Sequence, residues 1–391
     1  MNEDKSSRYH RLKRQASVVS LAWGVLVLAG LLGTGLTFTL RALAESSAGR
    51  VVSTLNLTPV RWCSALTVVG YVCLLTVVNE VGGAPVGLYA GFVLERRYGL
   101  SNERLAVWLW DRVKAVAVGL LLACGGAVIV YALMAASPHW WWLTAGLAFA
   151  TLIIGLTQFA PVLLLPLFYR LKPLDRDTLK TRLFVLAERA GARVLGAYEW
   201  NLSDKTRKAN AALTGLGATR RILVSDTMLD QYSDDEIEVV LAHELAHHVH
   251  GDIWKGIFFE SGLIIAGFYL AARLIQTLAV PLGLTGVADV AGLPLLVLAA
   301  GAVSFVMVPA AHAMSRAFER RADRFALDLT RNPDAFISAM RRLGAQNMAE
   351  ERPSRIVQWL FYSHPPLHER IAAAQAFANR RMAGFRSSAA V

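Results

Sequence analysis

Long apolar runs with at most one charged residue each dominate this 391-residue chain and leave few folds open to it. A helix crosses the hydrocarbon core of a bilayer with roughly 20 apolar residues, and several runs approach or exceed that length. The runs cover residues 15–40, 62–79, 115–169 with a break at 137–139, 256–272 and 290–315. Hydrophobic residues make up 55% of the chain and charged residues only 18%, which is too apolar for an ordinary soluble enzyme. The sequence predicts a mainly α, polytopic membrane protein with about six transmembrane helices, the first retained rather than cleaved as a signal peptide.

Basic residues are unevenly distributed around these runs. They cluster before the first run, between the second and third, and after the fourth, at Arg8, Arg11, Lys13, Arg14, Arg96, Arg97, Arg104, Arg112, Lys114, Arg170 and Lys172. Loops rich in Lys and Arg stay in the cytoplasm, so both termini are predicted to be cytoplasmic. Three arginines in the first outer loop weaken this contrast, while Trp140, Trp141 and Trp142 suit an aromatic belt at the outer interface. This topology accounts for the net charge of +11, and no nucleic-acid partner is expected.

The most specific motif in the chain is H-E-x-x-H, formed by His243, Glu244 and His247. Successive helical residues are about 100° apart, so the two histidines share a face at about 6 Å along the axis and can bind one metal ion. Glu244 projects beside them and is the predicted general base for a zinc-activated water. The motif therefore predicts a catalytic site with one Zn²⁺ per chain.

The helix that carries this motif has recognisable ends. Ser233 and Glu236 have the spacing of a capping box, the first turn is acidic, and Gly251 suits a C-terminal cap. A helix from about 234 to 250 is predicted. Its acidic first turn argues against a position deep in lipid.

A third zinc ligand must come from another segment. His248 points away from the metal-binding face, and His250 is about 10 Å along the axis from His243, too far to share one zinc. Glu319 is the best candidate, and Asp323, four residues later on the same helical face, would hold a ligand imidazole. Taken alone, the segment around Glu319 also fits an exposed helix with local ion pairs.

Residues 170–254 are more polar than the rest and predict a small folded segment. It contains a helix near 177–190, strands near 193–200, 208–213 and 220–225, and a hairpin turn at 215–217. A free strand edge beside the metal helix would hydrogen-bond an extended peptide. A hairpin that only covers the helix fits the sequence equally well.

A final cluster lies near the C-terminus, where Pro365 and Pro366 suit a helix start. His364 and Arg370 flank this start and could donate hydrogen bonds to an oxyanion or to a substrate carboxylate. Taken alone, a surface His and Arg on a proline-led helix is the simpler interpretation.

The motifs and runs together divide the chain into four parts. These are an N-terminal membrane region with four spans (1–169), a catalytic segment with the H-E-x-x-H motif (170–254), a transmembrane hairpin (255–315) and a C-terminal catalytic segment with the third ligand (316–391).

In combination these residues resemble the integral-membrane zinc metallopeptidases typified by the type I CAAX prenyl proteases. The resemblance covers nearly the whole chain and rests on short segments in a shared order. They are residues 84–89, 95–100, 166–169, 173–174, 210–211, 221–224, 226–227, 243–247, 318–323, 363–366 and 369–370.

The resemblance implies a helical barrel around a water-filled chamber, with a zincin-like cytoplasmic domain that carries a small β-sheet. It implies that Glu319 is the third zinc ligand and that Asn210 and Ala211 lie on a substrate-binding strand. It also implies that His364 and Arg370 act near the scissile peptide. We expect this protein to lack the extra N-terminal span of eukaryotic members, and its richness in Ala, Gly and Arg is more typical of a bacterial inner-membrane protein.

The expected function is that of a zinc-dependent endopeptidase at the cytoplasmic membrane face. Its substrates would be peptides or proteins, prenylated or membrane-associated, reached from the lipid bilayer. One alternative is a quality-control protease that cuts membrane proteins without a prenyl group by the same chemistry. A more distant alternative is a non-enzymatic membrane protein whose zinc only joins helices. Structural zinc sites usually have four protein ligands, whereas three are identified here, which favours catalysis.

Overall fold

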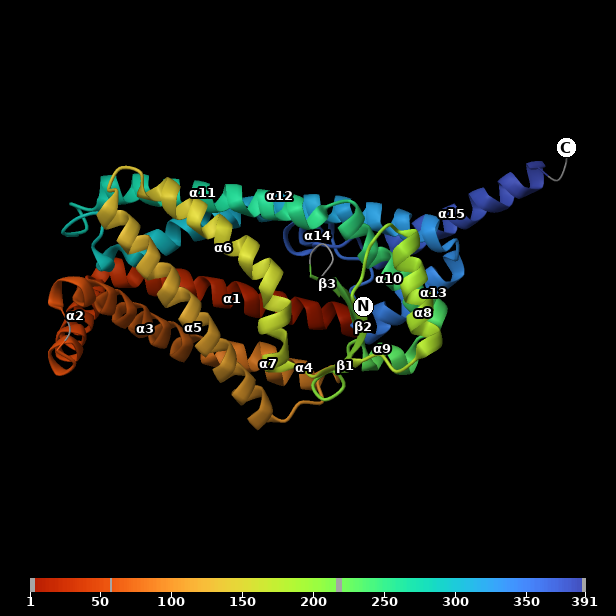
Figure 1. The fold of residues 1–391 in the computed structure, drawn as a ribbon, viewed down its shortest axis with the longest axis horizontal. Coiled ribbons are helices and arrows are strands. Elements are labelled where there is room, and N and C mark those ends of the chain that lie inside the picture. The colour runs from red at the N-terminus through yellow and green to blue at the C-terminus, as the bar shows by residue number, and fades with distance from the viewer. Residues whose placement is uncertain (1–3, 57, 216–219, 389–391) are drawn as a thin grey trace.

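The computed structural model describes residues 4–56, 58–215 and 220–388. Within these residues six helical segments are long and apolar enough to cross a membrane, as the apolar runs predicted. They are α1 (Lys5–Thr34), α3 (Pro59–Leu88) with its continuation through η1 (Tyr89–Val93) and α4 (Leu94–Arg97), α5 (Leu105–Ala136), α6 (Trp141–Leu163), α11 (Asp252–Leu278) and α12 (Leu293–Thr330). In Figure 1, α1, α11 and α12 run along the length of the molecule, and α5 and α6 cross it obliquely.

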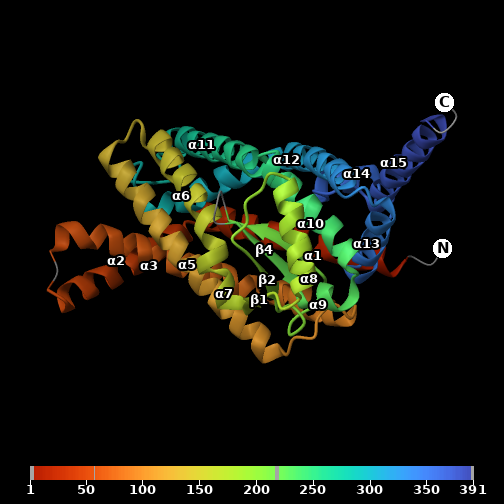
Figure 2. The ribbon, with the colours of Figure 1, turned by 45° about the vertical axis from the view of Figure 1, so that its right-hand side comes forward.

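Two of the predicted spans have different ends in the structure. The run at 15–40 is not one helix, because Gly35 adopts a left-handed conformation (φ 76°) that favours glycine and ends α1. The chain then folds back as α2 (Leu36–Thr54) along α3, and Figure 2 shows this pair projecting from the end opposite the sheet. The run at 62–79 continues as helix past Glu80, whose carboxylate forms an ion pair with Arg112 at 2.5 Å. The predicted break at 137–139 is confirmed between α5 and α6.

Buried apolar side chains hold the membrane helices together. Trp141 is fully buried and packs edge-on against Phe268 with ring centroids 6.0 Å apart, so its predicted place in an aromatic belt is wrong. Trp140 remains 60% exposed. A cavity of about 400 Å³ lies among α3, α5, α6, α11 and α12, mostly apolar but reached by Glu260 and Ser304.

A small α/β unit follows the fourth membrane helix. Its elements are α7 (Leu165–Phe168), β1 (Leu171–Pro173), α8 (Asp177–Arg189), β2 (Gly196–Trp200), β3 (Ala211–Thr214), β4 (Arg221–Ser225), α9 (Asp226–Gln231) and α10 (Asp234–Val249). The strand order is β1-β2-β4-β3, with β2 and β4 parallel and the other pairs antiparallel. The predicted helix and three strands are confirmed. Leu216 and Gly217 of the predicted hairpin turn lie outside the described residues.

Three more helices complete this end of the molecule. The short η3 (Val290–Gly292) leads into α12, which is followed by α13 (Pro333–Gln346), α14 (Arg355–Phe361) and α15 (Leu367–Ser388). The sheet, α8, α10 and α13 share one apolar core in which Leu179, Ile222, Ile237 and Phe336 are fully buried. Figure 1 places this core at the same end as the start of α1, so the two segments that carry the predicted ligands meet there.

Candidate active site

Helix α10 begins at a complete capping box. The amide of Glu236 donates to Ser233 Oγ at 3.3 Å, and the amide of Ser233 donates to Glu236 Oε2 at 2.8 Å. The predicted helix is confirmed, and its start determines which residues face α12. His243 and His247 consequently lie one turn apart, with ring centroids separated by 5.1 Å and planes at 84°.

Glu319 of α12 faces both imidazoles. Its Oε2 is 3.2 Å from His243 Nε2 and its Oε1 is 3.4 Å from His247 Nε2. The three side chains offer one ligand atom each within 4.8 Å of one another. Glu319 Oε2 is buried and accepts no hydrogen bond of normal geometry from the described residues. Two imidazole nitrogens and a carboxylate oxygen at this spacing suit a zinc ion.

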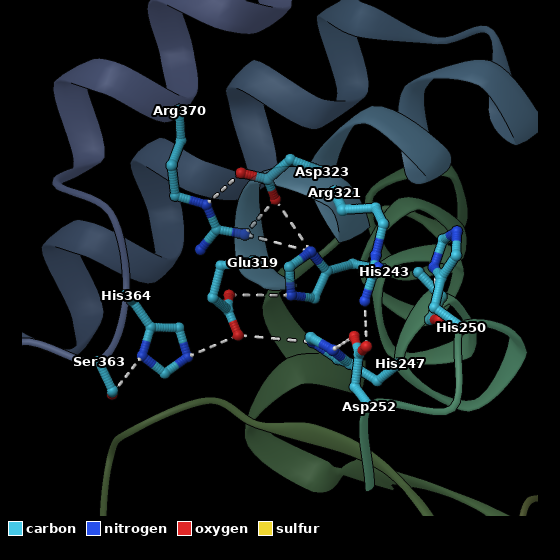
Figure 3. Close-up of polar contacts among 11 residues, drawn as sticks. His243, His247, His250, Asp252, Glu319, Arg321, Asp323, Ser363, His364 and Arg370 are labelled. Atoms are coloured by element: carbon cyan, nitrogen blue, oxygen red, sulfur yellow. Dashed lines mark hydrogen bonds and ion pairs between the residues drawn. The ribbon is translucent and has the colours of Figure 1, made fainter. Parts of the chain in front are cut away.

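Each imidazole is held from behind by a second carboxylate, as Figure 3 shows. His243 Nδ1 is 2.9 Å from Asp323 Oδ1, and His247 Nδ1 is 3.1 Å from Asp252 Oδ2. A neutral imidazole that donates Nδ1–H to a carboxylate presents the Nε2 lone pair on the other side, toward Glu319. Asp323 and Asp252 are both buried, so the two rings have little freedom to rotate.

The carboxylates around the imidazoles favour positive charge between α10 and α12. Burial lowers the pKa of His243, but the adjacent carboxylates of Asp323 and Glu319 outweigh it and raise the pKa to about 9. Burial also acts to lower the pKa of His247. Hydrogen bonds to Glu319 and Asp252 outweigh this effect and raise the pKa. A metal cation would satisfy the same preference.

Two arginines neutralise the supporting carboxylates. Arg370 Nε and Nη2 lie 2.9 and 2.5 Å from the two oxygens of Asp323, and Nη2 is also 3.3 Å from His243 Nδ1. Arg321 forms the equivalent ion pair with Asp252. A buried carboxylate requires such a partner, because an unpaired charge in the interior is costly. The Arg370 guanidinium thus contacts Asp323 rather than open solvent.

Asp252 was missed by the sequence analysis. It is the first residue of α11, directly after Gly251, which has φ 66° and separates α10 from α11. An Asp at a helix start is usually explained as a favourable charge for the helix dipole, so its type and place gave no distinct signal. The turn at Gly251 brings it back to His247, and only the arrangement of α10, α11 and α12 reveals this contact.

Glu244 and His364 line a common cleft of about 400 Å³ together with His243, Asn210 and Ala211. Burial raises the pKa of Glu244, while the nearby histidines act in the opposite direction. His364 is exposed, and its Nε2 lies 3.4 Å from Glu319 Oε1. The structure therefore brings the predicted ligands, base and C-terminal histidine to one place (Figure 3 shows His364 facing Glu319).

Strand β3 lies at the edge of the sheet and forms one wall of the cleft. The Ser225 amide donates to the carbonyl of Asn210 at 2.9 Å, so the peptide groups of Asn210 face β4. In an antiparallel pair the next residue points its amide and carbonyl the other way, which directs those of Ala211 toward the free edge. The same alternation exposes the carbonyl of Leu213, which is 3.0 Å from His248 Nε2. His248 thus joins α10 to the edge strand.

His250 is the C-cap residue of α10 and is not among the residues that line the cleft. Its Nδ1 lies 2.8 Å from the carbonyl of Ala246 within its own helix turn. Neither His248 nor His250 belongs to the group of potential metal ligands.

Comparisons with known proteins agree with this geometry. The model of peptidase family M48 matches residues 173–378, and that of the CAAX prenyl protease N-terminal region, described as five membrane helices, matches residues 2–170. The chain belongs to peptidase family M48. An uncharacterized metalloprotease of Bacillus subtilis, YhfN, is 30% identical to this M48 member over 79% of the chain and 74% of the relative. The CAAX prenyl protease 1 of Saccharomyces cerevisiae is 28% identical over 66% of the chain and 56% of that protein.

A solved structure shows the same fold. The crystal structure of Ste24p from S. mikatae superposes with a TM-score of 0.82 at 22% identity, covering 95% of this chain and 88% of that one. The family matches and this likeness identify the M48 member as a multi-pass membrane metallopeptidase with a CAAX prenyl protease-like architecture.

Proposed function

We propose that this protein is a zinc-dependent endopeptidase that hydrolyses peptide bonds at the cytoplasmic membrane face in the manner of CAAX prenyl proteases. The convergence of His243, His247 and Glu319 beside the Glu244 carboxylate in one cleft carries this proposal. Both ligand segments lie at the end where α1 begins, and the basic residues of the sequence favour a cytoplasmic position for that end.

His243, His247 and Glu319 would hold one Zn²⁺. A zinc ion with three protein ligands supplies Lewis-acid chemistry, since it acidifies a water and polarises a carbonyl. Structural zinc sites are normally closed by four protein ligands, so a three-ligand site favours catalysis over joining helices. Asp323 and Asp252 would fix the imidazole orientations that ligation requires.

Glu244 is the proposed general base. It accepts a proton from the attacking water and returns it to the nitrogen of the departing amine. Burial raises its pKa above that of an exposed carboxyl group, which makes Glu244 a better proton acceptor.

The substrate would bind as an added strand on β3. The amide and carbonyl of Ala211 face the free edge and would pair with an extended peptide, while Asn210 flanks the same wall. The cleft floor is apolar, with Met228, Val240, Met340, Leu343 and Leu367, which suits an apolar side chain next to the scissile bond.

His364 and Arg370 have different proposed roles. The exposed imidazole of His364 reaches the cleft and would donate to the oxyanion that develops on the scissile carbonyl. Arg370 also lines the cleft, but its guanidinium donates hydrogen bonds to Asp323. Because Asp323 in turn contacts His243, the main effect of Arg370 would be on the orientation and charge of that imidazole.

We propose the natural substrate from the names of the relatives. Several are named CAAX prenyl proteases, which favours a prenylated peptide or protein presented from the membrane. Quality control of membrane proteins is the second candidate, because the B. subtilis relative is named only as a metalloprotease. The sequence composition favours a bacterial inner membrane as the site of action.

Zinc content and cleavage of a farnesylated CAAX peptide, measured in detergent for the wild type beside Glu244→Gln, test this function. Stoichiometric zinc in both proteins with cleavage only by the wild type is the expected result. Zinc without cleavage in either would favour quality-control substrates. Metal-free protein after careful purification would refute the zinc enzyme.

A further inference from the structure

A cavity of about 400 Å³ lies away from the catalytic cleft and shares none of its lining residues. It lies between the start of α5, the end of α7 and the loop between β2 and β3. Its polar lining includes Glu103, Arg104, Arg170, Asp204 and Lys205. The proposed hydrolysis uses none of these residues.

Glu103 is the unusual member of this group. It is only 9% exposed, yet its carboxylate accepts no hydrogen bond from the described residues, and Oε1 is shut off from solvent. Lys205 attracts Glu103, but the Lys205 ammonium is already bound by Asp111 and by the carbonyl of Phe168 at 2.7 Å. Oε2 likewise accepts no hydrogen bond from the described residues but is not closed to solvent, so a donor from outside the chain can bind this oxygen and reduce the cost of the buried carboxylate.

The cavity also presents basic groups without partners. Arg104 and Arg170 line it, and among the described residues neither guanidinium makes a hydrogen bond or ion pair. Unpaired guanidinium groups favour a phosphate, which they bind by charge-assisted hydrogen bonds. The cavity therefore combines a site for a hydrogen-bonding cation with a site for a phosphate.

The position of the cavity indicates where such a ligand would come from. It lies where α5 begins and α7 ends, at the level at which the membrane helices enter the α/β unit. Val107 lines the cavity and is 43% exposed, and Trp110, one turn further along α5, is 63% exposed. Leu167 of α7 is also exposed. Apolar side chains that continue from a polar cavity toward the bilayer suit acyl chains below a headgroup, and Trp is frequent at this interface.

We propose that this cavity binds the headgroup of a membrane phospholipid that carries both a primary ammonium and a phosphate, as phosphatidylethanolamine does. The ammonium donates to Glu103, and the phosphate accepts from Arg104 and Arg170. A trimethylated ammonium cannot donate a hydrogen bond, and a headgroup without an amine leaves Glu103 unpaired, so the site selects against both. The bound lipid would join α5 and α7 to the loop between β2 and β3.

Native mass spectrometry of the zinc-loaded, full-length protein in detergent tests this site. The probes are phosphatidylethanolamine, its singly and doubly N-methylated forms, phosphatidylcholine and phosphatidylglycerol, all with the same acyl chains. Wild-type protein should retain phosphatidylethanolamine about tenfold more strongly than phosphatidylcholine, the usual effect of one hydrogen bond to a charged group. Retention should fall with each added methyl group.

Variants assign the contacts. Glu103→Gln should lower phosphatidylethanolamine retention about tenfold, to the level of phosphatidylcholine. The double variant Arg104→Gln/Arg170→Gln should weaken retention of every phospholipid. The exposed Glu188→Gln and Arg193→Gln serve as matched controls with unchanged retention, since neither side chain lines this cavity.

Several results would overturn the site. Equal retention of phosphatidylethanolamine and phosphatidylcholine by wild type would exclude the ammonium contact, as would stronger retention of phosphatidylglycerol. Unchanged retention in Glu103→Gln with wild-type thermal stability would do the same. If Glu103→Gln fails to fold, the double variant Arg104→Gln/Arg170→Gln still tests the site. Unchanged phospholipid retention by the double variant would refute the phosphate contact. If free phosphoethanolamine displaces the lipid when both are present at equal concentration, the site binds the free headgroup as well as the lipid, and the assignment to a membrane phospholipid is excluded.

Discussion

Asp252 offers the sharpest test of the metal centre, because its contacts with His247 and Arg321 are visible only in the structure. Asp252 Oδ2 is 3.1 Å from His247 Nδ1, and Oδ1 accepts from Arg321, so both oxygens are occupied. Asp252→Asn preserves the volume of this side chain and removes its charge. The Asn amide can turn its N–H toward His247 Nδ1, which already carries a hydrogen when Nε2 binds the metal. Two donors would then face each other, and the imidazole would lose its orientation.

The expected magnitude follows from these contacts. Loss of a carboxylate behind a ligating histidine typically weakens metal binding by roughly 10- to 100-fold, or about 1.4 to 2.7 kcal/mol. Asp252→Asn also leaves Arg321 without its buried counter-charge close to the cation site. We therefore expect the upper half of that range. Asp323→Asn should have a comparable effect through His243, because it has the equivalent geometry.

The assay is competition for zinc between the purified protein and a chelating indicator in detergent. Asp328→Asn is the matched control, since Asp328 is exposed on the same helix as Asp323 and lies outside the metal centre. Cobalt-substituted protein adds a readout independent of turnover, because its visible spectrum reports ligand geometry. Thermal unfolding of the metal-free proteins shows whether folding itself has changed.

One result would refute the reasoning. If Asp252→Asn binds zinc within about twofold of wild type, with an unchanged cobalt spectrum, then packing of α10 alone orients His247. The ion pair with Arg321 would in that case serve only to hold α11 against α12.

Four further substitutions test the remaining assignments. Glu244→Gln should keep stoichiometric zinc and cleave at less than about one hundredth of the wild-type rate, and higher activity would exclude it as the general base. Glu319→Ala should lose zinc on dialysis, measured by metal analysis, and full occupancy would remove it from the ligand set. Arg370→Ala should keep zinc bound, because it removes a positive charge that opposes a cation at His243, and should slow cleavage, so unchanged kinetics would contradict a role of Arg370 in the reaction. His364→Ala should retain zinc and lower kcat more than it raises KM, so unchanged kinetics would contradict its oxyanion role.

The amino-acid sequence alone determined the local features of this protein. Apolar runs long enough to cross a bilayer predicted the six membrane helices, because membrane insertion depends on composition over about 20 residues. The capping box at Ser233 and Glu236 predicted the start of α10, and helical periodicity placed His243 and His247 on one face. These properties are decided by neighbours within a few turns of the chain.

Helix ends inside the membrane were predicted less well, for a physical reason. The first apolar run does not show that Gly35 breaks it, because glycine also occurs within membrane helices. The second run was predicted to end before Glu80, but the ion pair with Arg112 from another helix allows the helix to continue. Trp141 was assigned to the interface by its type, whereas packing against Phe268 buries it.

Only the tertiary structure decided how the metal centre is supported. Glu319 lies 76 residues after His243 in the sequence, and the convergence of their ligand atoms depends on how α10 packs against α12. The contacts of Asp252 with His247 and Arg321, and of Arg370 with Asp323, likewise join separate helices. A sequence motif records which groups are available, but burial and the position of distant charges determine which of them meet, because both depend on the packing of the whole chain.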